Sequence, residues 1–294
     1  FQNACDAAQE FPGRVFVVDS RNLSTGIGHL VIDGALLARE GKSGEEIQAI
    51  LDERREKLNV SFVIDTLEYL RKGGRCSAVA ALAVAAYGRE NVFGVLMPNG
   101  VQPDIDYSQA LVEHLNIPHT TINIHDAVEG VLNELKKAGI EPSRQTTVNL
   151  PSRIRMATLY AVAQSLPGGT VINTSNLSED WVGYCTIYGD SAGAFSPLGM
   201  YTTEEVIALG RQLGLPEKFL IKPPSDGLTG LTDEDNLGFT YHAVNEYVRR
   251  GVVEPAIKEQ IDAKHRASRF KFQTIPVYHN GLPMALEDET NYYK

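Results

Sequence analysis

Apolar and polar positions predict a series of short elements in the first quarter of the chain. One helix is expected to place Ile32, Leu36 and Leu37 on a single face, because apolar residues recur there at helical spacing. The elements that we predict, in chain order, are a strand at 14–18, helices at 29–40 and 44–58, a strand at 59–64 and a helix at 65–72.

From residue 77 onward the pattern becomes more regular. We predict helices at 77–87, 107–115, 127–137 and 152–164, with strands at 92–97, 120–124 and 170–174 between them. Helices and strands that alternate at these lengths indicate a parallel sheet covered on both faces. The fold class predicted for this part is therefore α/β, with a Rossmann-like doubly wound sheet.

Composition narrows the classes of function. The 294 residues carry a net charge of −10, which argues against a nucleic-acid-binding surface, since such surfaces are basic. Apolar runs are too short for a membrane span, so no membrane partner is expected. The three cysteines are widely spaced, a pattern that suits a reducing cytoplasm and predicts neither a disulfide framework nor a zinc site.

Polar side chains gather after the strand predicted at 170–174. Thr174, Glu179 and Asp190 follow the carboxyl end of that strand, which is where open α/β sheets bind ligands. Arg153 and Arg155 are expected near a helix start, where cations and free N–H groups meet phosphates. The alternative is structural. Under that reading, the acids lie on a solvated face and the helix caps are Asn149, Ser152 and Thr232.

Taken together, these strings resemble the ammonia-dependent NAD synthetase family over about residues 77–282. The resemblance rests on NLPSRIRM, TSNLSEDWVGYCTIYGD, PPSDG and TDEDNLG, and on GRENVFGVLMPNG nearer the start. It implies an adenine nucleotide α-hydrolase-like fold of the ATP pyrophosphatase type. It also implies the amidation of deamido-NAD with ammonia through an adenylylated intermediate, with ATP as co-substrate and Mg²⁺ as cofactor, in a homodimer.

The same resemblance implies roles for individual residues. Those implied to be catalytic are Gly73, Gly74, Ser77 and Asp190; those implied to contact ATP are Gly73, Gly74, Ser77, Thr174 and Ser225. Those implied to contact deamido-NAD are Asn149, Arg153, Tyr160 and His265. Glu179 is the implied metal ligand, because Mg²⁺ prefers hard oxygen ligands.

Three positions depart from the family pattern. The loop that reads SGGxDS in the family is KGGRCS here, so that Cys76 stands in place of an aspartate. Ala194 replaces a usual acid, and Thr203 lies near a position that is often lysine. These departures predict impaired catalysis, or a catalytically dead fusion. The strand that precedes the loop in the family is also missing, so we predict that the strand at 59–64 fills the centre of the sheet.

The first part of the chain resembles a different family. VFVVDSRNLSTGIG and FVIDTLEYLRKGGRCSAVAAL are similar to the DegV family of fatty-acid-binding proteins, over residues 1 to about 82. The alternative function that this implies is lipid binding, with Ser24 as the surviving carboxylate contact; a simple turn cap is the competing role for Ser24. The chain is therefore interpreted as a chimera, with a DegV-like α/β segment at 1–76 and a synthetase-like domain at 77–294.

Overall fold

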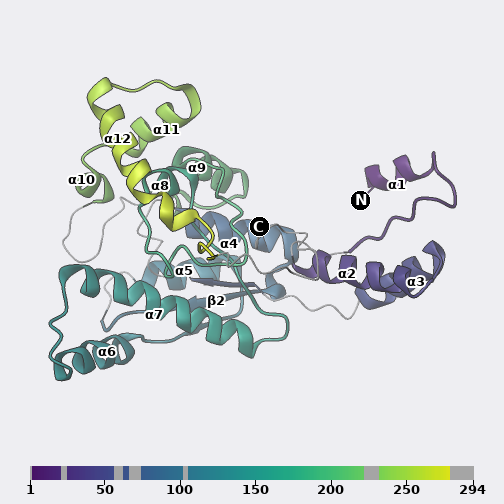
Figure 1. Cartoon of the computed structure of the whole chain (residues 1–294), viewed down its shortest axis with the longest axis horizontal. Helices are drawn as coiled ribbons and strands as arrows, with labels where there is room; N and C mark the ends of the chain where they lie inside the picture. The colour runs from purple at the N-terminus through teal and green to yellow at the C-terminus, as the bar shows by residue number, and fades with distance from the viewer. Residues whose placement is uncertain are drawn as a thin grey trace.

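A computed structural model describes residues 2–20, 25–55, 62–65, 74–101, 105–221 and 232–278. Its first part consists of α1 (Gln2–Ala8), α2 (Thr25–Arg39) and α3 (Gly44–Arg55), which extend away from the rest of the molecule (Figure 1). The remaining elements form a body with a parallel sheet and a helical lobe. Within the described residues, no helix is long and apolar enough to cross a membrane.

The α2–α3 unit has a small core of its own. Leu30 and Leu37 of α2 pack against Leu51 of α3. The predicted face of α2 is wrong in part, because Ile32 and Leu36 are 59% and 50% exposed. Leu30 and Leu37 lie seven residues apart, two helical turns along one face, and that line is the one that contacts α3. The strand predicted at 14–18 is also wrong, since these residues form no strand.

The body is built on a parallel sheet of four described strands in the order β3-β2-β1-β4. The strands are β1 (Phe62–Asp65), β2 (Val92–Leu96), β3 (His119–Thr121) and β4 (Thr170–Val171). Strand β1 lies in the centre, with Phe62 opposite Val92 of β2 on one side and opposite Thr170 of β4 on the other. The prediction that a strand from 59–64 fills this place is therefore confirmed for residues 62–64, while residues 59–61 lie outside the described residues.

Helices cover both faces of the sheet. On one face lie α4 (Arg75–Tyr87) and α5 (Ile105–Leu115); on the other lies α7 (Arg144–Ser165), with α6 (His125–Lys137) beside it (Figure 1). The order from β1 to β3 places α4 and α5 on one side, because parallel crossovers are right-handed, and the return to β4 places α7 on the other. The predicted doubly wound arrangement is confirmed. The short turn η1 (Arg89–Asn91) leads into β2.

A helical lobe follows β4. It contains α8 (Leu177–Val182), α9 (Thr203–Gln212), η2 (Glu217–Phe219), α10 (Asp233–Leu237), α11 (Tyr241–Arg250), α12 (Pro255–Ser268) and η3 (Arg269–Phe272). Its core joins Val182 of α8 to Val244 of α11 and Ile261 of α12. Thr232 caps α10 through a capping box with Asp235, as the structural alternative predicted for Thr232.

The start of α7 differs from the prediction. We expected this helix to begin at Ser152, but it begins at Arg144, with Ser143 as the N-cap and Pro151 inside the helix. Proline usually marks a helix boundary, which is why the sequence pattern placed the start about two turns too late. Asn149 and Ser152 are therefore interior residues of α7 and not caps.

The entry into α4 depends on a glycine. Gly74 has a φ of +77°, and an added Cβ atom would lie 2.8 Å from the Cα atom of Leu220. We expect Gly74→Ala to lower the free energy of unfolding by about 2 kcal/mol or more, through backbone strain together with this clash. Urea unfolding would measure the loss.

The matched control for this change is Gly214→Ala. Gly214 also has a φ of +77°, but an added Cβ atom would meet nothing within 4 Å. This variant should carry only the cost of the left-handed backbone, about 1–2 kcal/mol. Equal losses in the two variants would show that the close approach of Leu220 is unimportant.

Candidate functional site

The residues that directly follow the carboxyl end of β4 include several buried polar side chains. Asn173, Thr174, Ser175 and Asn176 follow the strand and are all buried. The side chain of Asn173 joins this segment to a later loop: its Nδ2 donates to the carbonyl oxygens of Asp190 (2.9 Å) and Ala192 (3.2 Å). Its Oδ1 accepts from the backbone N–H of Ser175 (2.9 Å). One amide side chain thereby fixes the carboxyl edge of the sheet against the 189–192 loop.

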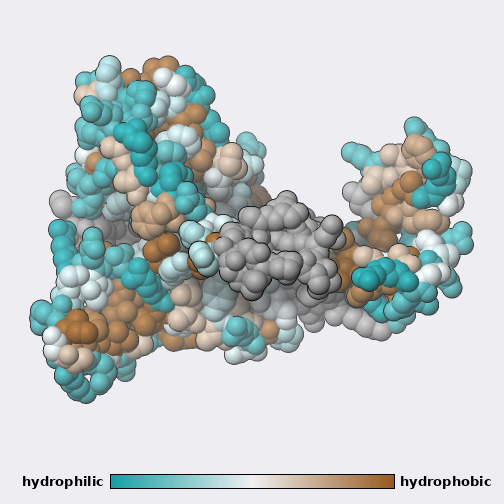
Figure 2. All heavy atoms as spheres, viewed as in Figure 1, coloured by the Kyte–Doolittle hydropathy of each residue, from teal (hydrophilic) through white to brown (hydrophobic). Residues whose placement is uncertain are grey.

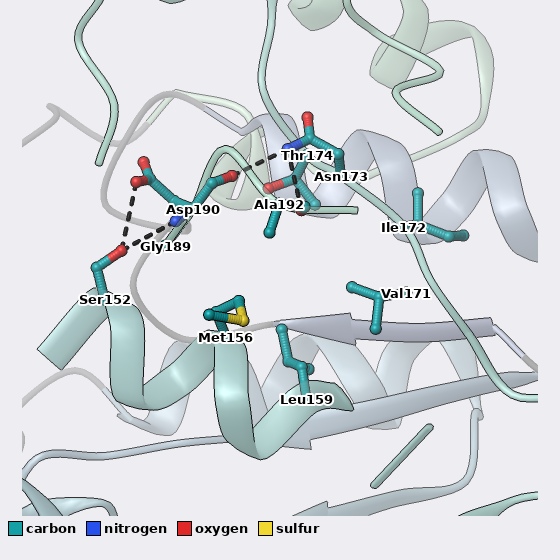
Figure 3. A pocket seen from close by; sticks show the side chains of 10 residues that line it. All are labelled: Ser152, Met156, Leu159, Val171, Ile172, Asn173, Thr174, Gly189, Asp190 and Ala192. Atoms are coloured by element: carbon teal, nitrogen blue, oxygen red, sulfur yellow. Dashed lines mark hydrogen bonds between the residues drawn. The ribbon is translucent and has the colours of Figure 1, made fainter. Parts of the chain in front are cut away.

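A pocket lies between this segment, the 189–192 loop and α7 (Figure 3). Its cavity volume is about 20 Å³, room for about one water molecule, so a nucleotide would lie over this pocket and not inside it. Its walls are formed by Ser152, Met156, Leu159, Val171, Ile172, Asn173, Thr174, Gly189, Asp190 and Ala192. The structure thus brings Thr174 and Asp190, predicted from sequence, to one site at the edge where parallel sheets bind ligands.

The position of Asp190 is held from two directions. Its backbone N–H donates to Ser152 Oγ (3.0 Å), and its carboxylate Oδ1 accepts from the backbone N–H of Thr186 (2.6 Å). Asn149, one turn before Ser152 on α7, accepts from Thr186 Oγ1 (2.8 Å). Helix α7 therefore fixes the loop that carries the carboxylate. Sequence reasoning treated Ser152 only as a possible cap and missed this role.

The arginines of α7 do not lie at a helix start. Arg153 and Arg155 are nine and eleven residues inside α7, so the prediction that they lie near a helix start, where free N–H groups also meet phosphates, is wrong. Arg155 is buried and donates from Nε to the carbonyl oxygen of Met97 (3.0 Å), at the end of β2. Arg153 donates from Nε to the carbonyl oxygen of Ile187 (3.3 Å), which lies just before the 189–192 loop. Tyr160, on the same helix, packs against the main core.

The altered loop leads into the first turn of α4. Gly74 is the N-cap residue, and Cys76 and Ser77 are fully buried in the turn that follows. The hydroxyl of Ser77 has no hydrogen-bond partner in the part of the chain that the structure describes. Gly73, Ser225 and Ser24 lie outside the described residues.

Sequence reasoning missed a buried ion pair. Arg75, in the first turn of α4, pairs through Nη1 with the Oε2 atom of Glu179 on α8, and each side chain is 1% exposed. Helix α8 is capped by Asn176, whose Oδ1 accepts from the backbone N–H of Glu179 (3.2 Å). A signal was available, because an arginine after two glycines opens an otherwise small and apolar helix.

With this geometry established, comparison with known proteins decides the family. The family model of NAD synthase matches residues 46–279, most of the chain. The chain belongs to the NAD synthase family. An NH(3)-dependent NAD(+) synthetase of Pyrococcus horikoshii is 38% identical over 218 residues, 73% of this chain and 81% of that protein. The corresponding synthetase of Carboxydothermus hydrogenoformans is 33% identical over 77% of this chain and 93% of that protein.

Solved structures of NAD synthase relatives agree. The NMN synthetase from Francisella tularensis superposes with a TM-score of 0.68 at 32% identity, covering 77% of this chain and 92% of that one. The NH3-dependent NAD synthetase from Campylobacter jejuni gives a TM-score of 0.59 at 27% identity, covering 77% and 93%. These likenesses agree with the predicted α/β fold of this family.

A second family model matches the start of the chain. The DegV family, described as uncharacterised, matches residues 1–87, so residues 46–87 are matched by both families. The central strand β1 lies in this shared stretch. The boundary predicted between residues 76 and 77 stays a prediction, as does the lipid-binding role of Ser24.

Two other expected positions have structural roles in this NAD synthase fold. His265 on α12 lies with its Nδ1 atom 2.8 Å from the carbonyl oxygen of Trp181, and the two rings stack with centroids 4.2 Å apart. Thr203, near the position that is often lysine, accepts through Oγ1 from Asn245 Nδ2 (3.0 Å). Asn245 in turn accepts through Oδ1 from Ser178 Oγ (2.6 Å). A neutral, buried network therefore occupies the surroundings of Thr203.

The residues present do not fit a divalent cation at Glu179. Its carboxylate is paired with a guanidinium, and the residue at the aspartate position of the family loop is the buried thiol Cys76. Among the described residues, no group of three or more His, Cys, Asp or Glu side chains is placed to hold a metal ion. The metal role expected for Glu179 therefore finds no support in the geometry.

Burial raises the pKa of Asp180, next to Glu179, to about 6, although the charges of Arg75 and Arg269 oppose the rise. The folded chain keeps this proton up to about pH 6, whereas the unfolded chain loses it near pH 3.8. Stability should therefore fall as pH rises between these values, by at most about 3 kcal/mol. Urea unfolding from about pH 4 to pH 7 should show this fall in the wild type but not in Asp180→Asn.

Asp262→Asn provides a control of the opposite sign. The hydrogen bond from Lys258 lowers the pKa of Asp262, so that its stabilising effect is present above the unfolded pKa and is lost as pH falls. This variant should lose stability near neutral pH and leave the fall due to Asp180 in place. A fall that survives in Asp180→Asn would assign it to another group.

Proposed function

We propose that this chain is an ammonia-dependent ligase that uses ATP to convert deamido-NAD into NAD. The observation that carries the proposal is the pocket at the end of β4, lined by Thr174 and Asp190 and fixed by Asn173 and α7. The named relatives support the same reaction, because they are NH(3)-dependent NAD(+) synthetases and the chain covers most of their length. ATP is the co-substrate of this family.

The reaction has two steps. A carboxylate oxygen of the nicotinate ring attacks the α-phosphorus of ATP, and pyrophosphate leaves. Ammonia then attacks the acyl carbon, AMP leaves with the bonding electron pair, and the new ammonium nitrogen loses a proton to a base. In our proposal Asp190 accepts that proton, since a positioned carboxylate beside the acyl carbon can act as a general base. Mg²⁺, the cofactor that the family resemblance implies, would supply positive charge to the ATP phosphates.

The nucleotide contacts follow the sheet edge. We assign ATP phosphate contacts to the backbone amides of Gly73 and Gly74, and to Ser77, Thr174 and Ser225. Backbone N–H groups that precede a helix favour phosphate groups. Thr174 lies on the pocket wall and Gly74 begins α4, which supports this assignment. Because Cys76 is neutral and Glu179 is paired with Arg75, turnover is expected to be slower than in a synthetase with both acids free.

The dinucleotide is assigned to the α7 side of the pocket. Asn149, Arg153, Tyr160 and His265 are the proposed contacts, and Asn149 and Arg153 support this by reaching the 186–190 loop. The proposed assembly is a homodimer. Figure 2 shows apolar surface over α6 and the start of α7, where Val131, Ile140 and Val148 are 39%, 55% and 43% exposed. Exposed apolar residues grouped in this way indicate a protein contact.

A mononucleotide substrate is the second candidate. The Francisella tularensis structure, which superposes with a TM-score of 0.68, is an NMN synthetase. The same amidation on the acid form of that mononucleotide would need the same pocket and no second nucleotide site. Parallel assays with both acids as substrate separate the two functions.

The test of the proposed function is pyrophosphate release that requires ATP, ammonia and one of the two acid substrates. We expect Asp190→Asn to lower kcat by about 10²–10⁴, because an amide cannot take the proton. Ser191→Ala is the matched control, since its hydroxyl donates to the carbonyl oxygen of Thr186 (3.0 Å) and it does not line the pocket. Substrate-independent pyrophosphate release, or equal rates in the two variants, would contradict the proposal.

The assembly is tested by sedimentation at micromolar concentration. We expect a dimer for the wild type. For Ile140→Glu we expect a dimer dissociation constant about tenfold or more higher, because a buried, unpaired carboxylate is costly. Val252→Glu is the control: Val252 is also highly exposed, at 63%, but lies between α11 and α12. A wild-type monomer would refute the proposed assembly.

A further inference from the structure

The buried pair of Arg75 and Glu179 joins two helices that meet at the edge of the sheet. Arg75 lies in the first turn of α4, where the N-terminal end of a helix carries partial positive charge. A guanidinium is unfavourable there unless an anion compensates it. Glu179, in the first turn of α8, is that anion, and the pair is almost entirely removed from water.

Further acidic groups surround the pair. Asp233, at the start of α10, is completely buried, and neither of its carboxylate oxygens has a hydrogen-bond partner among the described residues. Burial first, and Asp233 next, raise the pKa of Tyr241, while the charge of Arg75 opposes them. The positive charge of Arg75 also reaches Asp180. Arg75 is therefore a counter-ion shared by Glu179 and Asp180.

A divalent cation is one way to balance buried carboxylates in a protein, because Mg²⁺ and Mn²⁺ bind carboxylate oxygens. The guanidinium already occupies that role here. A guanidinium carries only hydrogen-bond donors, so it has no lone pair to offer to a metal ion. A second cation beside Glu179 would meet repulsion from Arg75 in a site with little water to screen it.

We propose that Arg75 replaces the divalent cation in this chain. The guanidinium neutralises Glu179 permanently, so Glu179 binds no metal as long as Arg75 is present. The ion pair gives α4 and α8 a fixed charge balance that does not depend on metal supply. This inference rests on the proposed function only where it interprets Arg75 as a change in an enzyme site. The metal-binding measurement itself needs neither nucleotide nor turnover.

Cys76 allows a direct test. It follows Arg75 in the same turn of α4 and is equally buried, so Cys76→Asp restores the carboxylate of the family pattern one residue from Arg75. We expect Cys76→Asp alone to gain no metal site, because Arg75 still holds Glu179. The double variant Arg75→Val, Cys76→Asp frees both carboxylates and should bind one equivalent of Mn²⁺, about tenfold or more tighter than the wild type.

The measurement is the fraction of free Mn²⁺ during titration with manganese chloride, by electron paramagnetic resonance. Addition of Glu179→Gln to the double variant is the control, and it should abolish the gain. A tightly held equivalent of Mn²⁺ in the wild type, or in Cys76→Asp with Arg75 intact, would overturn the proposal. So would a folded double variant that binds Mn²⁺ no better than the wild type.

A second measurement does not depend on the folding of any variant. Thermal unfolding of the wild type is compared with EDTA and with manganese chloride, since a ligand that binds the folded state raises Tm. An unchanged Tm supports the replacement of the metal by Arg75. A Tm that rises with Mn²⁺ and returns with EDTA would overturn it, whatever the result of the turnover assay.

Discussion

The pairing of β1 between β2 and β4 is the constraint on which the rest of the structure depends. The strand is short, but its backbone groups hydrogen-bond to neighbours on both sides. Without it, β2 and β4 would each leave a row of their own N–H and C=O groups unpaired inside the molecule. Helix α4 begins after Gly74, only nine residues beyond the end of β1, so the position of β1 also limits where Arg75 can lie.

The carboxyl edge of this sheet concentrates the polar chemistry. Strand β4 ends in a buried amide, Asn173, that holds the loop bearing Asp190, and α7 holds the same loop from the other side through Ser152. Side chains that are fixed by several partners lose less freedom when a ligand binds. The pocket is therefore a preorganised part of the fold.

Where α4 meets α8, a charge within the protein neutralises a buried carboxylate. A buried carboxylate needs a counter-charge, and in this chain Arg75 supplies it to Glu179 from within the protein. The neutral network of Thr203, Asn245 and Ser178 lies in the same lobe and needs no counter-ion. Both features let the lobe fold around α8 with Glu179 paired and with Ser178 and Asn245 hydrogen-bonded.

The amino-acid sequence by itself determined the alternation of elements from residue 77 onward and the identity of the polar residues after β4, because hydrophobic periodicity and strand ends are local signals. It also led to the family. The bounds of α7 were not determined locally, since Pro151 imitates a helix start. Only the tertiary structure decided which face of α2 is buried and that Arg75 meets Glu179. These two outcomes depend on contacts between side chains on different elements, and a local pattern of residues carries no information about the partner.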